Sequence, residues 1–258
     1  MPLHSIWDPA LAAEIKAAKE EYRDQSPSSP NHVEIRRGGE YVMKKISWQW
    51  PGWLAEGKFH VIGGQKGDGK STLVFELLAQ LTCGGKWPDG SPAPLGDVLI
   101  WSGEDDIEDT ILPRIAGAGG DVKRCVFIDG VIAEGVKRAF DPAVDMLRLL
   151  NTAKQLPDLK SMLIDPVVSA TAGDSHKNSE TRRGLQPLVD MAAERHVSVI
   201  GVTHFTKGTQ GRDPIERITG SLAFGAIPRV VWGTAKGDDL DGARRLVRIA
   251  SNIGPSGG

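Results

Sequence analysis

The sequence predicts an α/β fold in which a mainly parallel sheet is covered by helices on both faces. From residue 32 onward, short and continuously apolar segments alternate with longer segments of helical pattern. Continuous apolar strands are typical of parallel sheets, because helices bury both faces of each strand. The chain has 258 residues, 40% hydrophobic and 25% charged, which suits one large core with appendages.

Strands are predicted where a short apolar run is bounded by glycine or polar residues. These runs are Phe59–Gly63, Asp97–Ser102, Arg124–Asp129, Ser161–Asp165, Val197–Thr203, Arg229–Thr234 and Arg245–Ala250. Helices are predicted between them, where good helix formers carry apolar residues at helical spacing. These segments are Ser71–Thr82, Asp106–Ala118, Ala143–Leu156 and Glu180–His196.

The N-terminal segment is predicted to be an arm. Residues 8–23 favour a helix, because Asp8 can cap it, Pro9 suits the first turn and strong helix formers follow. Residues 24–31 have the composition of a linker. We therefore divide the chain into a helical arm and linker, residues 1–31, and one domain, residues 32–258. The arm is too small for its own core, so it either docks on a neighbouring subunit or lies on its own domain.

Composition limits the partners and the compartment. Thirty-one basic and 33 acidic residues give a formal net charge of −2, so any nucleic-acid contact must come from local basic loops. Cys83 and Cys125 lack metal-ligand spacing, which favours ordinary thiols in a reducing compartment. No apolar run approaches the roughly 18 residues needed to span a membrane, and the N-terminus lacks a signal pattern. We expect a cytoplasmic protein without a membrane partner.

Residues Gly64–Ser71 match the phosphate-binding pattern G-x(4)-G-K-[ST]. A predicted strand precedes the motif and a predicted helix follows it, which is the context that a P-loop requires. Backbone N–H groups of such a loop point at phosphate oxygens, and the helix N-terminus adds partial positive charge. We expect Lys70 to contact the β- and γ-phosphates of ATP and Ser71 to bind Mg²⁺. The predicted nucleotide-binding residues are Gly64, Gln65, Lys66, Gly67, Asp68, Gly69, Lys70, Ser71 and Thr72.

Polar residues follow the next predicted strands directly. The carboxyl ends of parallel strands face the crevice where ligands bind. Glu104, after Asp97–Ser102, is predicted to orient the attacking water, although Asp105 and Asp106 could instead cap the next helix. Asp165 ends an apolar strand and is predicted to hold Mg²⁺ beside Ser71. His204 could sense the γ-phosphate or serve only a structural role.

The order of these motifs resembles the RecA-like ATPases, and more closely the RepA-type hexameric replicative helicases of plasmids, phages and mobile elements. The resemblance covers about residues 48–255. Its specific fragments are Trp53–Lys58, Gly103–Asp106, Leu112–Ile115, Ile164–Pro166, Thr203–Lys207, Gly220–Ser221 and Ser251–Pro255. It implies a RecA-like P-loop NTPase core that uses ATP and Mg²⁺. It also implies a homo-oligomeric ring, usually of six subunits, that acts on single-stranded DNA beside other replication proteins.

The resemblance further implies an arginine supplied in trans to the γ-phosphate, where charge develops during hydrolysis. The family's spacing places this arginine at Arg229, with Arg244, Arg245 and Arg248 as alternatives; an ordinary surface arginine remains the other interpretation. Two basic loops would face the central channel. Ala170–Gly184 contains Lys177 and Arg182, and Phe205–Gly220 contains Lys207 and Arg212; both loops could equally be solvated surface.

The sequence departs from the family pattern at Gln65–Lys66, where a proline is common, and in the absence of a lysine just before Asn252. The chain could also be one domain of a longer protein. Three functions therefore stay open: a ring-forming DNA motor, a recombinase-like or regulatory ATPase of the same core, and a module that binds ATP without turnover.

Overall fold

The computed structural model describes residues 13, 14, 16, 33–171, 178–206, 208, 209, 211–218, 223–236 and 244–254. The chain divides by compactness into two units, Met1–Lys45 and Ile46–Gly258. In the first unit, a short 3-10 helix covers Gly38–Glu40, and large apolar side chains such as Met43 are exposed. The helix predicted over residues 8–23 falls almost wholly outside the described residues, and the domain boundary predicted after residue 31 stays a prediction.

The second unit is built on a seven-stranded sheet with the order β11-β10-β3-β9-β8-β4-β5. All neighbouring strands are parallel except β10 and β11, which are antiparallel. This arrangement confirms the predicted fold class. The strands are β3 (Phe59–Gly63), β4 (Asp97–Ser102), β5 (Cys125–Phe127), β8 (Leu159–Asp165), β9 (Ser198–Val202), β10 (Val230–Lys236) and β11 (Arg244–Ser251).

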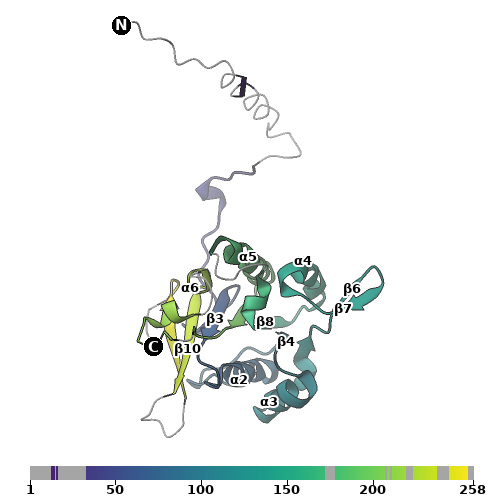
Figure 1. The fold of residues 1–258 in the computed structure, drawn as a ribbon, viewed down its shortest axis with the longest axis vertical. Coiled ribbons are helices and arrows are strands. Elements are labelled where there is room, and N and C mark those ends of the chain that lie inside the picture. Colours follow the sequence, from purple (N-terminus) through teal and green to yellow (C-terminus); the bar gives the residue numbers. More distant parts are fainter. Residues whose placement is uncertain are drawn as a thin grey trace. The chain divides into compact units, whose positions relative to one another are not determined.

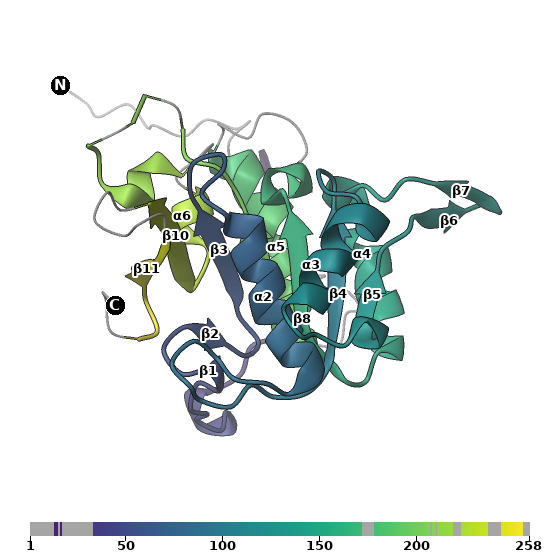
Figure 2. The same ribbon diagram turned by 90° about the horizontal axis from the view of Figure 1, so that it is seen from below.

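Helices cover both faces of this sheet, as Figures 1 and 2 show. On one face lie α2 (Lys70–Cys83) and α3 (Leu112–Gly117); on the other lie α4 (Pro142–Thr152), α5 (Asn178–Arg195) and α6 (Ala223–Ala226). Each face has its own buried apolar cluster, and alternate residues of β3 enter the two clusters. None of the helices in the described part of the chain is long and apolar enough to cross a membrane.

Some predicted elements keep their bounds in the structure, and others change. Strands β3 and β4 match their predicted bounds, and α2 extends its prediction by one residue at each end. The helix predicted over Asp106–Ala118 is instead a π-helical turn, η2 (Ile107–Ile111), followed by α3. Pro113 accounts for the interruption, because it has no backbone N–H to donate to the preceding turn. The strand predicted over Arg124–Asp129 shortens to three residues.

A tryptophan cluster attaches an unpredicted hairpin, β1 (Trp48–Trp50) and β2 (Leu54–Ala55), to the sheet. The Trp50 ring stacks on Trp53 at 5.0 Å and on Trp87 at 5.6 Å between ring centroids. The Arg248 guanidinium of β11 lies 5.4 Å from the Trp53 ring centroid and donates a 2.6 Å hydrogen bond to the Gly52 carbonyl. Stacking and a charge-assisted hydrogen bond thus fix the hairpin.

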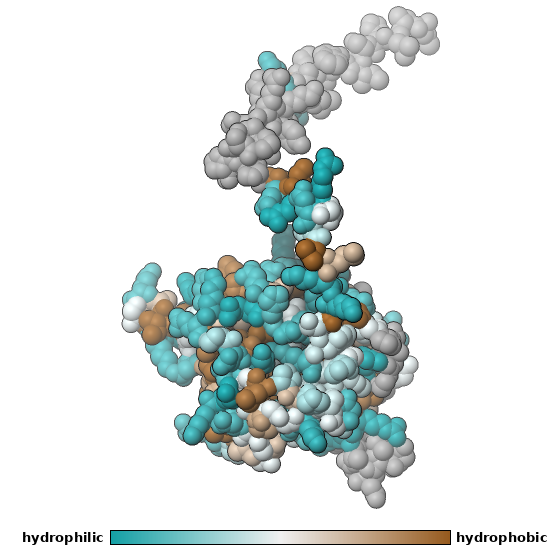
Figure 3. Space-filling view, turned by 180° about the vertical axis from the view of Figure 1, so that it is seen from behind, coloured by the Kyte–Doolittle hydropathy of each residue, from teal (hydrophilic) through white to brown (hydrophobic). Residues whose placement is uncertain are grey.

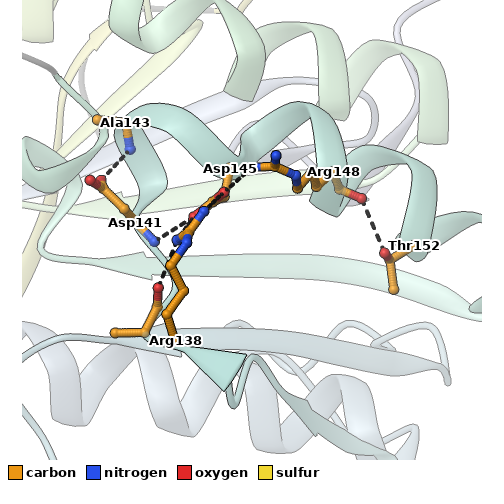
Figure 4. Close-up of polar contacts among 7 residues, drawn as sticks. Arg138, Asp141, Ala143, Asp145, Arg148 and Thr152 are labelled. Carbon is orange, nitrogen blue, oxygen red and sulfur yellow. Dashed lines mark hydrogen bonds and ion pairs between the residues drawn. The ribbon is translucent and has the colours of Figure 1, made fainter. Parts of the chain in front are cut away.

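A second unpredicted hairpin, β6 (Val131–Ala133) and β7 (Val136–Arg138), extends away from the sheet (Figure 2). A buried carboxylate on α4 holds its last residue, as Figure 4 shows. Arg138 donates two 2.6 Å hydrogen bonds to the two Asp145 oxygens, and Arg148 donates a third of 2.8 Å. The Asp141 N–H donates to the same carboxylate at 3.0 Å. These bonds, above all those from Arg138, hold the pKa of Asp145 well below its usual range.

Exposed apolar residues occur near this hairpin, among them Ile132 and Val136 on the hairpin and Val144 and Leu147 on α4. On the face drawn in Figure 3, hydrophobic residues are interspersed among hydrophilic ones. Scattered exposed apolar residues are normal on a folded domain and carry no functional implication by themselves.

Candidate nucleotide-binding site

The P-loop connects the end of β3 to the start of α2. Gly69 precedes the helix with φ +78°, a left-handed conformation that glycine adopts without strain. The Gln65 N–H donates a 2.9 Å hydrogen bond to Asp68 Oδ2, which closes the loop on itself. The loop therefore has a defined shape at the helix N-terminus, where anions are stabilised.

Lys70 begins α2 and is almost fully buried. Its Nζ donates hydrogen bonds to the carbonyls of Gly64 (3.2 Å) and Gln65 (2.9 Å), so the side chain folds back along the loop. Burial lowers the pKa of Lys70, and three nearby carboxylates oppose this shift: Asp68, Asp165 and Glu104. The ammonium group thus lies between the loop and the acidic groups of the site.

Ser71 and Asp165 meet at the predicted metal site. Ser71 Oγ donates a 2.8 Å hydrogen bond to Asp165 Oδ2, which joins α2 to the end of β8. Asp165 is 3% exposed, and burial raises its pKa to about 6. Glu104 and Asp105 raise it further by repulsion, whereas the Ser71 hydrogen bond and the charge of Lys70 lower it.

These residues fit Mg²⁺. A hydroxyl and a buried carboxylate side by side are oxygen ligands, and like-charged neighbours make a cation favourable there. The described residues contain no cluster of three or more His, Cys, Asp or Glu side chains arranged to hold a metal. This agrees with a magnesium ion that takes one or two ligands from the protein and the rest from phosphate and water.

Glu104 lies just beyond the end of β4. The Gly103 N–H donates a 2.7 Å hydrogen bond to the Asp165 carbonyl, so the segments that carry the two acids are tied together. The backbone N–H of Glu104 donates to Ser102 Oγ at 3.3 Å. Its carboxylate oxygen Oε1 lies 3.8 Å from His204 Nε2, and its side chain is about half exposed. Backbone hydrogen bonds therefore hold the segment that carries Glu104, and the exposure of its side chain leaves the carboxylate accessible to a water molecule.

The two acids after Glu104 have other partners. Asp106 accepts hydrogen bonds from the N–H groups of Glu108 (2.8 Å) and Asp109 (3.1 Å), so it caps η2, as one predicted alternative held. Asp105 does not cap a helix; it forms a 3.3 Å ion pair with Arg114. Among the three consecutive acids, Glu104 is the one that faces the histidine.

His204 follows β9 and lies across from Glu104. Burial lowers its pKa, and the charges of Lys70 and Lys66 lower it further, against the opposing effect of Glu104. The imidazole is therefore neutral at neutral pH, because its ordinary pKa is already about 6.5. A neutral imidazole can donate one hydrogen bond and accept another.

The residue after His204 rests directly on the P-loop. The Phe205 N–H donates a 3.0 Å hydrogen bond to the Gly64 carbonyl. Its ring packs against Gly63, where an added Cβ would lie 2.9 Å from Phe205 Cε1. The Arg217 guanidinium lies 4.4 Å from the ring centroid, and the Thr206 N–H donates a 2.7 Å hydrogen bond to the Arg217 carbonyl. Both ends of the 206–217 segment thus meet beside the nucleotide site.

A pocket opens next to this contact, with walls from the P-loop, the 205–217 segment, β10 and β11. The Thr234 hydroxyl of β10 is buried there and has no hydrogen-bond partner among the residues that the structure describes. It lies against Gly64, where any Cβ would overlap it. The sequence did not indicate Thr234, because its position depends on the pairing of β10 with β3.

The structure describes two of the four residues predicted to bind DNA, Arg182 and Arg212. Arg182 is exposed on α5, which begins at Asn178, so the helix includes part of the loop predicted over Ala170–Gly184. Arg212 is exposed in the 206–217 segment. Lys177 and Lys207 lie outside the described residues.

Arg229 lies at the opposite end of the sheet from its own P-loop. Its N–H donates a 2.8 Å hydrogen bond to the carbonyl of Phe59, the first residue of β3. The five residues of β3 therefore separate it from the P-loop, a distance of roughly 16 Å along the strand. Its side chain is exposed. The predicted role of Arg229 toward a neighbouring subunit stays a prediction.

Arg244 lies much closer to the chain's own P-loop. A Cβ added to Gly69 would overlap Arg244 Nη1 and lie 2.9 Å from Cζ, so the guanidinium covers this glycine. Arg244 was predicted only as an alternative arginine in trans. Its position here follows from the antiparallel pairing of β11 with β10, which no local pattern reveals.

Comparison with known protein families finds that a model described as an AAA domain matches residues 25–210. The matched region is more than two thirds of the chain and includes the P-loop, Glu104, Asp165 and His204. It ends before Arg229 and Arg244. Among curated proteins, none matches the chain.

Proposed function

The chain belongs to the AAA domain family, and from this premise we propose that it is a ring-forming, ATP-hydrolysing motor that moves along single-stranded DNA. Membership of the family supports a P-loop ATPase that binds nucleotide. The ring, the DNA and the helicase activity belong to the proposal, and they are supported by the motifs that resemble RepA-type replicative helicases.

The proposed hydrolysis depends chiefly on one observation. Ser71, Glu104, Asp165 and His204 meet at the carboxyl ends of neighbouring parallel strands, directly beside the P-loop. In open α/β sheets this edge is where ligands bind and react. The arrangement provides phosphate-binding amides, a cation, metal ligands and a half-exposed carboxylate within one site.

Each of these groups has a role in attack of water on the γ-phosphate. The Glu104 carboxylate accepts a hydrogen bond from the attacking water and takes up its proton. The water oxygen bonds to the γ-phosphorus while the bond from that phosphorus to the ADP oxygen breaks, which releases ADP and phosphate. Lys70 offsets the charge that develops on the β- and γ-phosphates. Ser71 and Asp165 would hold Mg²⁺, which when bound adds further neutralising charge. Neutral His204 can donate a hydrogen bond to the γ-phosphate or to Glu104.

One feature supports a site completed by a second subunit, and another supports a DNA contact connected to that site. Arg229 lies too far from its own P-loop to complete that site, whereas an exposed arginine on a second subunit could do so. Arg212 is exposed on a segment whose base is bonded to the P-loop, so a group that can contact phosphates is connected to the nucleotide site.

A second function is a recombinase-like or regulatory ATPase that acts on another protein. One observation favours it: the formal net charge is −2, so the chain has no overall attraction for nucleic acid. The same catalytic groups would operate, and only the partner of the 206–217 segment would differ.

The two functions differ in their response to single-stranded DNA. We would measure ATP turnover with and without DNA, and determine the oligomeric state under the same conditions by mass photometry. A closed ring with DNA-stimulated turnover is expected, and Lys70→Ala is expected to lack turnover in both conditions. If ATP turnover is the same with and without DNA over a range of salt concentrations, the result would contradict the motor and favour the regulatory ATPase.

Arg212→Ala tests the proposed DNA contact. Loss of a phosphate contact should weaken DNA binding across all sequences and reduce the salt dependence of binding by about one charge. Lys123→Ala removes an exposed cation from the β4–β5 connection and serves as the control. DNA affinity and a salt slope equal to those of the control variant would exclude this contact.

A further inference from the structure

The antiparallel β10–β11 ladder brings side chains to both ends of the P-loop. Thr234 on β10 lies against Gly64, and Arg244 on β11 covers Gly69. The register pairs Thr234 with Leu246 and Lys236 with Arg244, and Arg244 is the first residue of β11. The first and last glycines of the motif thus both contact this ladder.

Arg244 brings a positive charge to the P-loop. An arginine is protonated at any physiological pH, and among the residues that the structure describes no carboxylate forms an ion pair with it. Gly69 is also the N-cap of α2, the positive end of the helix. A positive charge at the N-terminus of a helix is unfavourable unless an anion lies beside both the guanidinium and that N-terminus.

The position of Arg244 also indicates which part of the nucleotide it contacts. In a P-loop the backbone N–H groups of the glycine-rich loop contact the α- and β-phosphates, whereas the lysine that follows reaches the β- and γ-phosphates. The Arg244 guanidinium lies against Gly69, the last glycine of that loop, and so beside the groups that would hold the α- and β-phosphates. Glu104, the carboxylate predicted to orient the attacking water, lies instead beyond the end of β4 and next to His204.

We propose that Arg244 binds the diphosphate portion shared by ATP and ADP, at the P-loop of its own chain. This inference rests on the proposed nucleotide binding and differs from a trans-acting arginine in two ways. A residue that binds the diphosphate affects ADP and ATP equally, whereas a group that meets the γ-phosphate during hydrolysis leaves ADP affinity unchanged. A residue that acts in cis cannot be replaced by a neighbouring subunit.

The first experiment measures the binding of ADP and of a non-hydrolysable ATP analogue by calorimetry. Arg244→Ala should weaken both by about tenfold or more, as expected for loss of one charge-assisted hydrogen bond. Arg244→Lys should recover part of the loss, and Lys123→Ala should bind as the wild type does. Unchanged ADP affinity in Arg244→Ala, with binding intact in the wild type, overturns the proposal. If the wild-type protein itself binds neither nucleotide, the proposed ATPase function fails instead.

The second experiment separates cis from trans. Arg244→Ala and Lys70→Ala chains are mixed, and ADP binding is compared with that of each variant alone. A cis residue leaves every site incomplete, so the mixture should bind no better than the mean of its components. A trans residue would let the intact Lys70 of one chain combine with the intact Arg244 of the other, and such recovery overturns the assignment to the chain's own P-loop. Circular dichroism melting shows that each variant is folded.

Discussion

The surroundings of Asp165 favour the neutral form of its carboxyl group over the charged form. Burial raises its pKa from 3.8 to about 6, so the folded, ligand-free chain binds a proton more tightly than the unfolded chain does. The charged form therefore destabilises the fold above pH 6, and this effect disappears as the pH falls toward 4. A carboxylate in this state is well suited to a cation, because cation binding relieves the same cost.

Asp165→Asn should therefore stabilise the ligand-free protein while removing magnesium-dependent turnover. Asparagine keeps an acceptor for Ser71 but cannot ionise, so the gain at pH 8 should be about 3 kcal/mol. Chemical denaturation without Mg²⁺ or nucleotide measures it, and the difference from the wild type should shrink toward zero near pH 4. A variant less stable than the wild type at pH 8 would contradict this account of Asp165.

Glu104→Gln should lower turnover by about 10²–10⁴-fold with little change in ATP binding, because glutamine cannot accept the proton of the attacking water. Single-turnover hydrolysis and calorimetric ATP binding measure the two effects separately. Glu108→Gln, an exposed neighbour in η2, is the matched control and should behave as the wild type. Equal turnover in the two variants would remove Glu104 from the mechanism.

The residues of the site differ in how far the sequence could predict them. The P-loop, Glu104, Asp165 and His204 stand out because each is adjacent in sequence to the end of a recognisable strand. The separate roles of Asp105 and Asp106 required the structure, since either residue could have capped η2. Arg244 and Thr234 could not be assigned, because their distance from the P-loop is set by pairing between strands far apart in sequence.

The β6–β7 hairpin is held to α4 chiefly through the Asp145 carboxylate. Because its folded-state pKa is depressed, the stabilisation is fully present above the ordinary carboxyl pKa, about 3.9, and is lost as the pH falls below it. Asp145→Asn should lower the free energy of unfolding at pH 7 by about 2 kcal/mol, since an amide cannot form the paired bonds to Arg138.

Thermal melting at pH 7 and pH 3 tests this stabilisation. The gap between the wild type and Asp145→Asn should be large at pH 7 and should narrow at pH 3. Asp129→Asn breaks the exposed ion pair with Lys137 on the same hairpin and should change stability little at either pH. A gap that is the same at both pH values would mean that ionisation of Asp145 is not the source.

At the scale of elements, the sequence predicts the sheet better than its additions. Strands β3 and β4 are buried on both faces, so their continuous apolar runs mark their bounds. The strands of β6–β7 have three residues each, and exposed Ile132 and Val136 sit among polar neighbours, so no periodic pattern identifies them. The β1–β2 hairpin is fixed by stacked tryptophans, and this interaction is invisible to local propensity.

For the molecule as a whole, Arg229 gives the sharpest test of cooperation between chains. If it completes a neighbour's site, Arg229→Ala should bind ATP and ADP normally yet hydrolyse ATP about 10³-fold more slowly. Mixing it with Lys70→Ala should restore part of the hydrolysis, because some sites then combine an intact Lys70 with a neighbour's intact Arg229. Steady-state turnover of the mixture measures this recovery.

Mixing with Lys70→Ala is therefore expected to restore part of the hydrolysis for Arg229→Ala and to restore no ADP binding for Arg244→Ala. Lys123→Ala again provides the control for loss of a surface cation. Wild-type turnover in Arg229→Ala, or the same turnover at concentrations where the protein is monomeric, would exclude Arg229 as the trans arginine.

The contact of Phe205 with the P-loop has a mechanical consequence. The 206–217 segment is closed at its base by the Thr206–Arg217 hydrogen bond, and that base is bonded to Gly64 through the Phe205 N–H. The base of this segment is therefore attached, through Gly63 and Gly64, to the loop that would hold the phosphates. A movement of the P-loop on nucleotide binding or release would then move the base of this segment with it.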